Sequence, residues 1–425
     1  MTDASPAGPR RSERGYGPDP GPVRAFLEER HLELARRAAA FGAEVVAERP
    51  EPADDPAARH EARALVQLLG EEGWLGPIAA QDFRACCLVR EALAAASPLA
   101  DAVFALQALA ATPLILAGRG PARERWLGPA VRGRALGAFA MTEPGAGSDV
   151  AAMATRAVRE GEAYVLDGRK AFISNAGIAD FYVVFAVTDP EAGRRGLSAF
   201  AVPAETRGLS FLGAQVLSSP HPLGEVAFEG CRVPASARIG EEGRGFGLGM
   251  ATLDRLRPTV AAAACGMAAR ALREALAHAV SRHQFGRPLA EFQLVQDKLA
   301  RMATDLTAAR LLTYRAAWER DGGAERTPVE SAMAKAHATE AAQRIVDDAV
   351  QILGGRGVLA AHPVDRLYRS VRALRIYEGT TEIQRLIIAG HLVEAARAAG
   401  AGASVAPGGE AARPGDASPG GGMPA

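Results

Sequence analysis

The stretch IYEGTTEIQR at residues 376–385 places a carboxylate, Glu378, between an aromatic residue and a glycine. Gly379 leaves room for another molecule to lie close to the backbone, and residues of helical spacing follow. A carboxylate in a cavity that excludes water is more basic than one in solution, and it removes protons from weakly acidic carbon atoms. By itself the stretch makes Glu378 no more than a candidate base, and a solvated loop carboxylate is the simpler interpretation.

Three further motifs precede this stretch: MTEPGAGSD at residues 141–149, RHQFG at residues 282–286 and QILGGRG at residues 351–357. The first has glycines that let backbone N–H groups approach a ligand, and hydroxyls on Thr142 and Ser148 that reach polar ligand atoms. Each motif also has an ordinary interpretation, because Gly-rich runs connect domains, arginines complement helix C-termini and paired glycines end helices. Their combination is more specific than any one of them.

The segment FISN at residues 172–175 follows a predicted strand. The Phe172 ring is suited to covering one face of a flat ligand, and the Ser174 hydroxyl is suited to hydrogen-bonding to it. A core Phe and a surface Ser at a strand end is the simpler interpretation of this segment alone. The neighbouring motifs favour the ligand-binding interpretation of this segment.

Hydrophobic periodicity divides the chain into helical, strand-rich and helical parts, which predicts an α+β fold. Residues 23–137 have helical spacing, residues 138–240 contain short β-branched and aromatic runs, and residues 241–398 return to helical spacing. Residues 1–22 and 399–425 are rich in Pro, Gly, Ala and Ser, which predicts disordered tails. The last helical part is expected to form an antiparallel bundle from long stretches at 250–281, 293–321, 328–353 and 381–399.

Composition limits the classes of partner. The chain has 425 residues, with 49 basic and 49 acidic ones, so net charge gives no reason to expect nucleic acid or an anionic membrane. Four cysteines without metal-binding or disulfide spacing fit a cytoplasmic protein with no metal site. No segment is expected to be apolar over a sufficient length to span a bilayer. Almost all basic residues are arginines, which we attribute to compositional bias.

The order and content of these motifs resemble the acyl-CoA dehydrogenase family over residues 26–393. The resemblance implies an N-terminal helical domain, a central β-barrel-like or β-sandwich domain and a C-terminal antiparallel four-helix bundle. It implies that FAD is the cofactor and that an acyl thioester is oxidised to the 2,3-enoyl product. It also implies that electrons pass to an electron-transferring flavoprotein, and that the enzyme is an oligomer, usually a homotetramer.

The resemblance also assigns roles to individual residues. Glu378 is implied to abstract the α-proton while the flavin N5 accepts the β-hydride, and the backbone N–H of Glu378 is implied to bind the thioester oxygen. The helix-end residues near Arg282 are implied to contact FAD of a neighbouring subunit. The implied cofactor-binding residues are Met141, Thr142, Gly147, Ser148, Phe172, Ser174, Arg282, Gln284, Phe285, Gln351, Gly354, Gly355, Thr380 and Glu382, and the implied substrate-binding residues are Ser148, Arg257, Tyr377 and Gly379.

Several positions depart from the family pattern. Leu256 stands where some members carry a helix-borne glutamate base, which favours Glu378. The loop after Pro77 is short, the segment 218–223 lacks the usual Arg-x-Ser-x-Thr pattern, and Gly390 replaces a common arginine. These departures lie toward the carrier end of the substrate, so an acyl carrier protein is an alternative to coenzyme A. A non-catalytic flavin-binding homologue is the alternative of another class, and Arg257 is alternatively a solvated helix charge.

Overall fold

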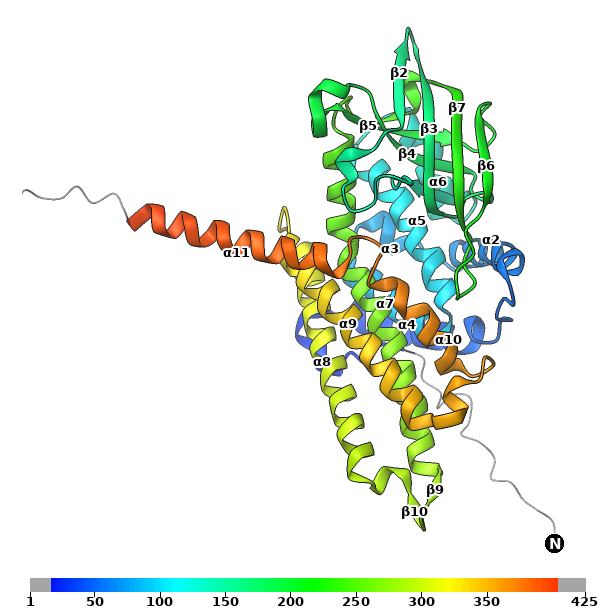
Figure 1. Cartoon of the computed structure of the whole chain (residues 1–425), viewed down its shortest axis with the longest axis vertical. Helices are drawn as coiled ribbons and strands as arrows, with labels where there is room; N and C mark the ends of the chain where they lie inside the picture. The colour runs from blue at the N-terminus through cyan, green and yellow to red at the C-terminus, as the bar shows by residue number, and fades with distance from the viewer. Residues whose placement is uncertain (1–16, 404–425) are drawn as a thin grey trace, which may run out of the picture.

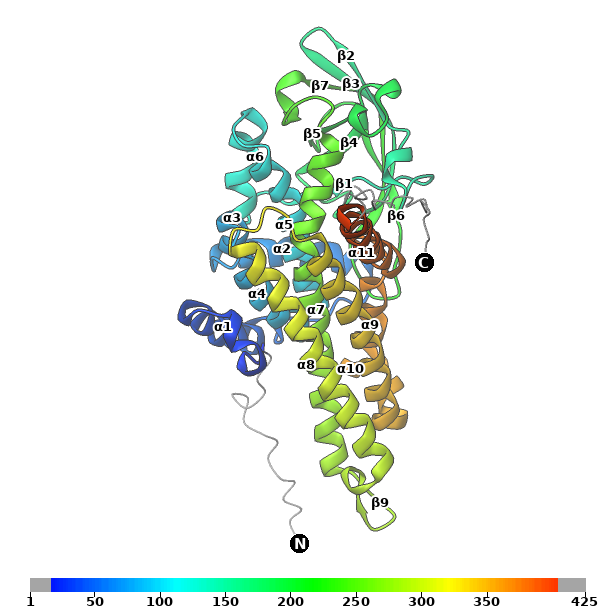
Figure 2. The ribbon, with the colours of Figure 1, turned by 90° about the vertical axis from the view of Figure 1, so that its left-hand side faces the viewer.

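The structure is a computed structural model that describes residues 17–403. A helical domain comes first, a β domain follows, and a long helical bundle completes the chain (Figure 1). The β domain lies at one end of the elongated molecule and the far end of the bundle lies at the other (Figures 1 and 2). The first helical domain consists of η2 (Gly21–Phe26), α1 (Glu29–Phe41), η3 (Gly42–Val46), α2 (Asp55–Glu71), α3 (Gly76–Ala80), α4 (Phe83–Ala96), α5 (Pro98–Leu116) and α6 (Pro121–Val131).

Helix α5 forms the centre of this domain. Ser97 caps its first turn by accepting a hydrogen bond from the Ala100 N–H, and Val103 and Phe104 have no exposed surface. The helix is 19 residues long and apolar enough, by length and composition, to span a membrane. The expectation that no such segment exists was therefore wrong. Most of this helix is buried inside the protein, as in the core helix of a large domain.

The central domain is one sheet of eight strands with the path β6-β7-β3-β2-β4-β5-β8, and β1 pairs with β4. Among the described strands, the half that ends in β2 and the half that begins with β4 pair only at Arg156 and Val187. Residues of both halves share one core that includes Tyr164, Phe200 and Val226. This curled arrangement fits the expected compact β domain. Its strands are β1 (Gly137–Ala140), β2 (Arg156–Glu160), β3 (Ala163–Ser174), β4 (Phe181–Val187), β5 (Leu197–Pro203), β6 (Leu209–Ala214), β7 (Leu223–Pro234) and β8 (Arg238–Ile239).

The C-terminal bundle has a different fourth member from the one expected. Helix α10 buries Val364, Leu367 and Val371 in the bundle core, whereas α11 contacts α9 near its start and then projects away from the body (Figure 1). The four long stretches predicted from sequence therefore omitted α10. The elements here are α7 (Gly245–Ser281), β9 (His283–Gln284), β10 (Arg287–Pro288), α8 (Gln293–Asp321), α9 (Pro328–Leu353), η8 (Gly354–Val358), α10 (Pro363–Leu374) and α11 (Thr381–Ala403).

Three predicted boundaries need correction. Helix α7 begins at Gly245 and not near residue 250, because its glycines serve close packing: a Cβ on Gly245 would lie 2.6 Å from the backbone of Ser198. Residues 21–22 belong to η2 and residues 399–403 belong to α11, so both predicted tails were too long. The rest of the predicted tails lies outside the described residues.

A buried ion pair holds α4 and α5 together beneath the site described below. Arg90 donates from Nε and Nη2 to the two carboxylate oxygens of Asp101 at 2.7 and 2.9 Å, and from Nη1 to Thr259 at 2.9 Å. Both partners of the pair are almost wholly buried. Charges removed from water in this way are stable only when they are fully paired.

We expect Asp101→Asn to lower the free energy of unfolding by about 3 kcal/mol, because it leaves the Arg90 charge buried without its counter-charge. Glu160→Gln is the matched control, since it removes one partner of the exposed Arg232–Glu160 pair and should change stability by less than about 0.5 kcal/mol. Urea unfolding of the three proteins measures both effects. Equal stability of Asp101→Asn and the unsubstituted protein would contradict this account of the pair.

Candidate active site

Glu378 lies in the turn between α10 and α11, and the turn has an unusual backbone. Glu378 has φ of 55° and Gly379 has φ of 92°, both in the left-handed region. A non-glycine residue rarely adopts this conformation, and such residues gather at functional sites. The φ of Gly379 favours glycine, and a Cβ there would also displace Gln384 Nε2, which would lie 2.5 Å away. The turn ends where the Thr380 hydroxyl accepts the Ile383 N–H at 3.3 Å and caps α11.

Side chains from three helices hold the two carbonyl groups of this turn. The Glu378 carbonyl accepts from Arg257 Nε of α7 and Gln384 Nε2 of α11, each at 3.3 Å. The Gly379 carbonyl accepts from Gln384 Nε2 at 3.0 Å and from Lys335 Nζ of α9 at 2.7 Å. All three donors are buried. The backbone of the base is therefore fixed from several directions before any ligand binds.

Glu378 is half-buried as a residue, but one oxygen of its carboxylate is both buried and free. Its Oε2 is buried and has no hydrogen-bond partner among residues 17–403. Burial raises the pKa of Glu378, while the positive charges of Arg90, Lys335 and Arg257 oppose this rise. A carboxylate of raised pKa with an unused acceptor is suited to taking a proton from a bound molecule.

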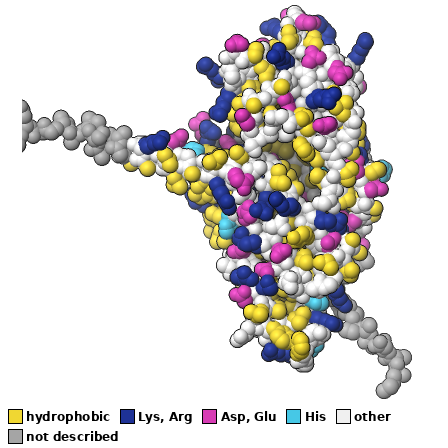
Figure 3. All heavy atoms as spheres, viewed as in Figure 1, with side chains coloured by type: hydrophobic (Ala, Val, Ile, Leu, Met, Phe, Trp, Pro, Cys, Tyr) yellow, Lys and Arg dark blue, Asp and Glu magenta, His cyan; other side chains and the backbone are white. Residues whose placement is uncertain are grey.

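A hollow opens in the face of the molecule shown in Figure 3, between the β domain and the start of α11. Two predicted loops of the β domain lie side by side, because the Thr142 carbonyl accepts the Ala171 N–H at 3.0 Å. A buried ion pair supports them: Lys170 Nζ donates to the Met141 carbonyl at 3.1 Å and to Glu143 at 2.8 Å. The structure thus brings the segments 141–148 and 172–174 together.

The second of these loops is also strained and open. Phe172 has φ of 55° and is 61% exposed, and Asn175 has φ of 64°. The Ser174 hydroxyl is hydrogen-bonded to His221 Nε2 at 2.8 Å. Burial lowers the pKa of His221 to about 4, so its ring is neutral near pH 7 and orients the hydroxyl without adding charge. His221 lies in the segment 218–223, which departs from the family pattern, and no role was predicted for it from the sequence.

Six predicted cofactor residues lie away from the Glu378 turn and from the two loops of the same chain. Phe285, at the turn between β9 and β10, is 93% exposed at the end of the molecule opposite the β domain (Figure 1). The end of α9 and η8 lie toward that same end, and most side chains there are exposed. Their placement fits the implied contact with cofactor bound to a neighbouring subunit. The six residues are Arg282, Gln284, Phe285, Gln351, Gly354 and Gly355.

The remaining predicted residues lie at or near the turn and the loops. Arg257 is buried with its guanidinium on the turn, so its alternative as a solvated helix charge is wrong. Gly147, Ser148 and Glu382 are exposed, and Tyr377 is 40% exposed beside Glu378. Lys335 and Arg90 were not predicted from the sequence. The signal available for Lys335 was the rarity of lysine in the chain.

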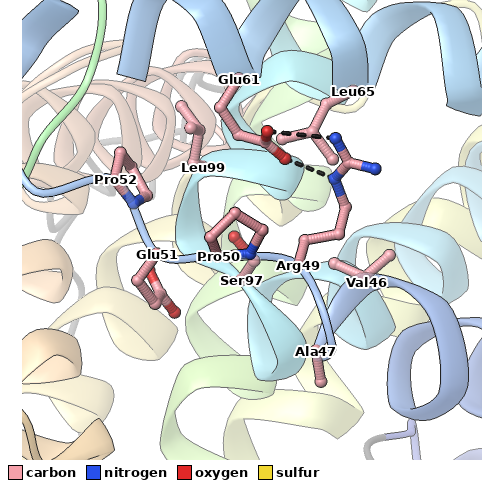
Figure 4. Close-up of a pocket in the computed structure, with 10 residues that line it drawn as sticks. All are labelled: Val46, Ala47, Arg49, Pro50, Glu51, Pro52, Glu61, Leu65, Ser97 and Leu99. Carbon is pink, nitrogen blue, oxygen red and sulfur yellow. Dashed lines mark hydrogen bonds and ion pairs between the residues drawn. The ribbon is translucent and has the colours of Figure 1, made fainter. Parts of the chain in front are cut away.

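A second hollow, shown in Figure 4, lies between the segment before α2 and the start of α5. Arg49 crosses it to pair with Glu61, with Nη2 donating to Oε2 at 3.1 Å. Glu51, which also lines the hollow, has Arg366 at 3.6 Å. The hollow contains none of the predicted site residues.

Relatives of known name are similar along most of the chain. A 3-(aryl)acrylate reductase of Clostridium sporogenes is 40% identical over 385 residues, which are 87% of this chain and 100% of that protein. The caffeyl-CoA reductase-Etf complex subunit CarC of Acetobacterium woodii is 41% identical over 293 residues, which are 67% of this chain and 76% of that protein. Butyryl-CoA dehydrogenase of Megasphaera elsdenii has a similar structure, with a TM-score of 0.80 and 34% identity over 86% of this chain and 99% of that one.

The residues of the two loops, 141–148 and 172–174, fit a flavin. A Cβ on Gly147 would meet no atom within 4 Å, so a ligand has space beside this backbone. The exposed Phe172 ring supplies an apolar surface for a flat ring system, and the Ser174 hydroxyl lies two residues further along the same strand.

Family models match nearly the whole described chain. They are the acyl-CoA dehydrogenase N-terminal domain at residues 28–134, the middle domain at residues 138–231 and the C-terminal domain at residues 243–393. These matches confirm the resemblance that the motifs indicated, and with it the predicted order of domains. The chain therefore belongs to the acyl-CoA dehydrogenase family of FAD-dependent oxidoreductases.

Proposed function

We propose that this enzyme dehydrogenates an acyl-CoA to the 2,3-enoyl thioester, with Glu378 as the base. The observation that carries the proposal is the buried Oε2 of Glu378, which has no partner in the described part of the chain and lies in a turn held by three helices. Glu378 takes the proton from the α-carbon, and a carbon–carbon double bond forms as the β-carbon loses hydride. FAD, when bound, accepts this hydride, and with it the two electrons of the oxidation.

The backbone of the turn has a further role in this proposal. Within residues 17–403 the Glu378 N–H has no acceptor, so it is available to the thioester oxygen. Negative charge develops on that oxygen as the α-proton leaves, and a fixed N–H donor stabilises it best when water is excluded. The left-handed φ of Glu378 sets the directions of its N–H and of its side chain, so one residue supplies both the proposed donor and the proposed base. Ser148, Arg257, Tyr377 and Gly379 are proposed to line the thioester.

A reductive use of the same site is a second candidate. It is favoured by the names of two relatives, the 3-(aryl)acrylate reductase and the caffeyl-CoA reductase subunit. In that direction a protonated Glu378 would return a proton to the α-carbon, and bound, reduced FAD would supply the hydride for the β-carbon. Both directions need the same base in the same place. An acyl carrier protein in place of coenzyme A is the alternative carrier in either direction.

Two partners belong to the proposal. An electron-transferring flavoprotein is the proposed electron acceptor, supported by the relative named as a subunit of an Etf complex. A homotetramer, the assembly that the family resemblance implies, is the proposed state; its sharing of FAD between subunits is supported by the distance of six predicted cofactor residues from segments 141–148 and 172–174 of their own chain. In such an assembly, Arg282 of one subunit meets FAD of its neighbour, where a guanidinium suits phosphate oxygens.

Glu378→Gln should retain FAD but lose reduction by substrate, because the amide keeps the shape of the side chain and cannot take a proton. The expected loss in the rate of flavin reduction is at least about 100-fold. Anaerobic stopped-flow bleaching of the flavin by acyl-CoA measures it, and flavin absorbance of the purified variant is the control for binding. Near-normal bleaching in this variant would place the base elsewhere.

The oxidative proposal also predicts that some acyl-CoA bleaches the flavin of the unsubstituted enzyme. Butyryl-CoA and 3-arylpropionyl-CoA are the first substrates to test, given the relatives described above. The same acyl group on an acyl carrier protein should be the poorer substrate by kcat/KM. No bleaching by any acyl thioester, together with no reoxidation of reduced enzyme by enoyl thioesters, would defeat the proposal.

Arg282→Ala should weaken FAD retention and, with it, the assembly, because a ligand bound across an interface stabilises the assembled state. Arg287→Ala is the matched control, since Arg287 lies in the same exposed hairpin over the Phe292 ring and has no proposed contact with FAD. Flavin content after gel filtration and the mass in solution are the measurements. A monomer that binds FAD stoichiometrically would contradict the proposed assembly.

A further inference from the structure

Lysine is rare in this chain, with three lysines against 46 arginines. Two of them, Lys170 and Lys335, have no exposed surface, although lysine is seldom buried. Lys170 is paired with Glu143 at 2.8 Å, which accounts for its burial. Lys335 lies on α9 and donates to the Gly379 carbonyl at 2.7 Å. A chain that uses arginine almost everywhere and yet buries a lysine at its catalytic turn indicates a need for a compact charge there.

Lys335 differs from the other two cations near the base in its pairing. The charge of Arg90 is balanced by both oxygens of Asp101, and the charge of Arg257 is balanced by Asp254. In the part of the chain that the structure describes, no carboxylate oxygen lies within 4.0 Å of Lys335 Nζ. Of these three positive charges, that of Lys335 is therefore the one without a directly paired carboxylate among the described residues.

Charged groups from five helices, α4, α5, α7, α9 and α11, affect the pKa values of Glu378 and Lys335. Burial raises the pKa of Glu378, and Arg90, Lys335 and Arg257 lower it, while Asp101 raises it further. Burial lowers the pKa of Lys335 to about 8, so most of this group is protonated at neutral pH. The other groups that act on Lys335 are Arg257, Glu340 and Glu382, and Tyr377 lies beside Glu378 in the turn.

We propose that Lys335 is a positioning residue for the base: its ammonium holds the left-handed turn through the Gly379 carbonyl and supplies the unpaired charge that keeps Glu378 ionised. This inference rests on the proposed function, in which Glu378 takes the α-proton. Lys335 does not touch the reacting atoms, and it acts through the turn and through the field at the carboxylate. A cation favours the carboxylate, so removing it raises the pKa of Glu378. Protonation of the base lowers the rate at low pH, and this part of the pH–rate profile is its acid limb. Removing the cation therefore moves the acid limb to higher pH.

Two substitutions separate the charge of Lys335 from its hydrogen bond. Lys335→Met removes both, and Lys335→Gln removes the charge while leaving an N–H donor on a side chain one bond shorter. The measurement is the pH dependence of flavin reduction by acyl-CoA in a single turnover of the holoenzyme. We expect the acid limb of the rate to move up by about one pH unit in both variants. Lys335→Gln also keeps the test open if Lys335→Met does not fold.

Two controls isolate the effect of charge at this position. Lys298→Met removes the third lysine, which is partly exposed on α8 and paired with Asp348 at 2.5 Å, and should leave the acid limb unchanged. Gln384→Met removes a donor to the same two carbonyl groups without changing the charge. It should lower the rate at every pH and leave the acid limb in place.

A second readout does not depend on turnover. At neutral pH, Lys335→Met should lower the urea midpoint of unfolding more in the unsubstituted background than in Glu378→Gln, because only the first contains the carboxylate that Lys335 stabilises. An unmoved acid limb in both Lys335 variants, with equal midpoint losses in the two backgrounds, would overturn the inference. Normal flavin reduction by Glu378→Gln would instead refute the proposed function, whatever the Lys335 variants do.

Discussion

A carboxylate with a buried oxygen beside three positive charges is the feature on which the rest of this structure depends. Burial makes Glu378 more basic, and the same burial would neutralise it if no positive charge lay nearby. The bundle resolves this conflict by bringing α7, α9 and α11 together at one turn, where Arg257, Lys335 and Gln384 bind its carbonyl groups. The long helices therefore set the geometry of a few atoms, and the strained backbone persists because several donors fix it.

The β domain supplies the other side of the hollow by a similar principle. A buried Lys170–Glu143 pair holds the loop that begins at Met141, and that loop hydrogen-bonds to the strand that carries Phe172. Buried ion pairs of this kind contribute little net stability but are costly to break. Their value here is in fixing the position of two loops against each other. The far end of the bundle, with its exposed Phe285, gains a function only through a neighbouring subunit in the proposed assembly.

Much of the fold followed from local patterns. Helices α8 (Gln293–Asp321) and α9 (Pro328–Leu353) have the predicted bounds, since Gly and Pro punctuate long apolar repeats there. Helix α7 starts earlier than predicted because its glycines pack against the β domain, which is a tertiary contact that a sequence pattern does not reveal. Glu378 itself was predicted from its motif. The three donors to its turn come from residues far apart in the chain, so only the folded structure relates them to the base.

The most direct test of the central claim separates proton removal from hydride transfer. A thioester without β-hydrogens, such as phenylacetyl-CoA or 3,3-dimethylbutyryl-CoA, offers an α-proton and nothing for the flavin to accept. In heavy water, the account predicts that the enzyme exchanges the α-hydrogens of such a thioester for deuterium, as followed by nuclear magnetic resonance, and that Glu378→Gln does not. Exchange at the same rate in both proteins, or in neither, would contradict the assignment of Glu378 as the base.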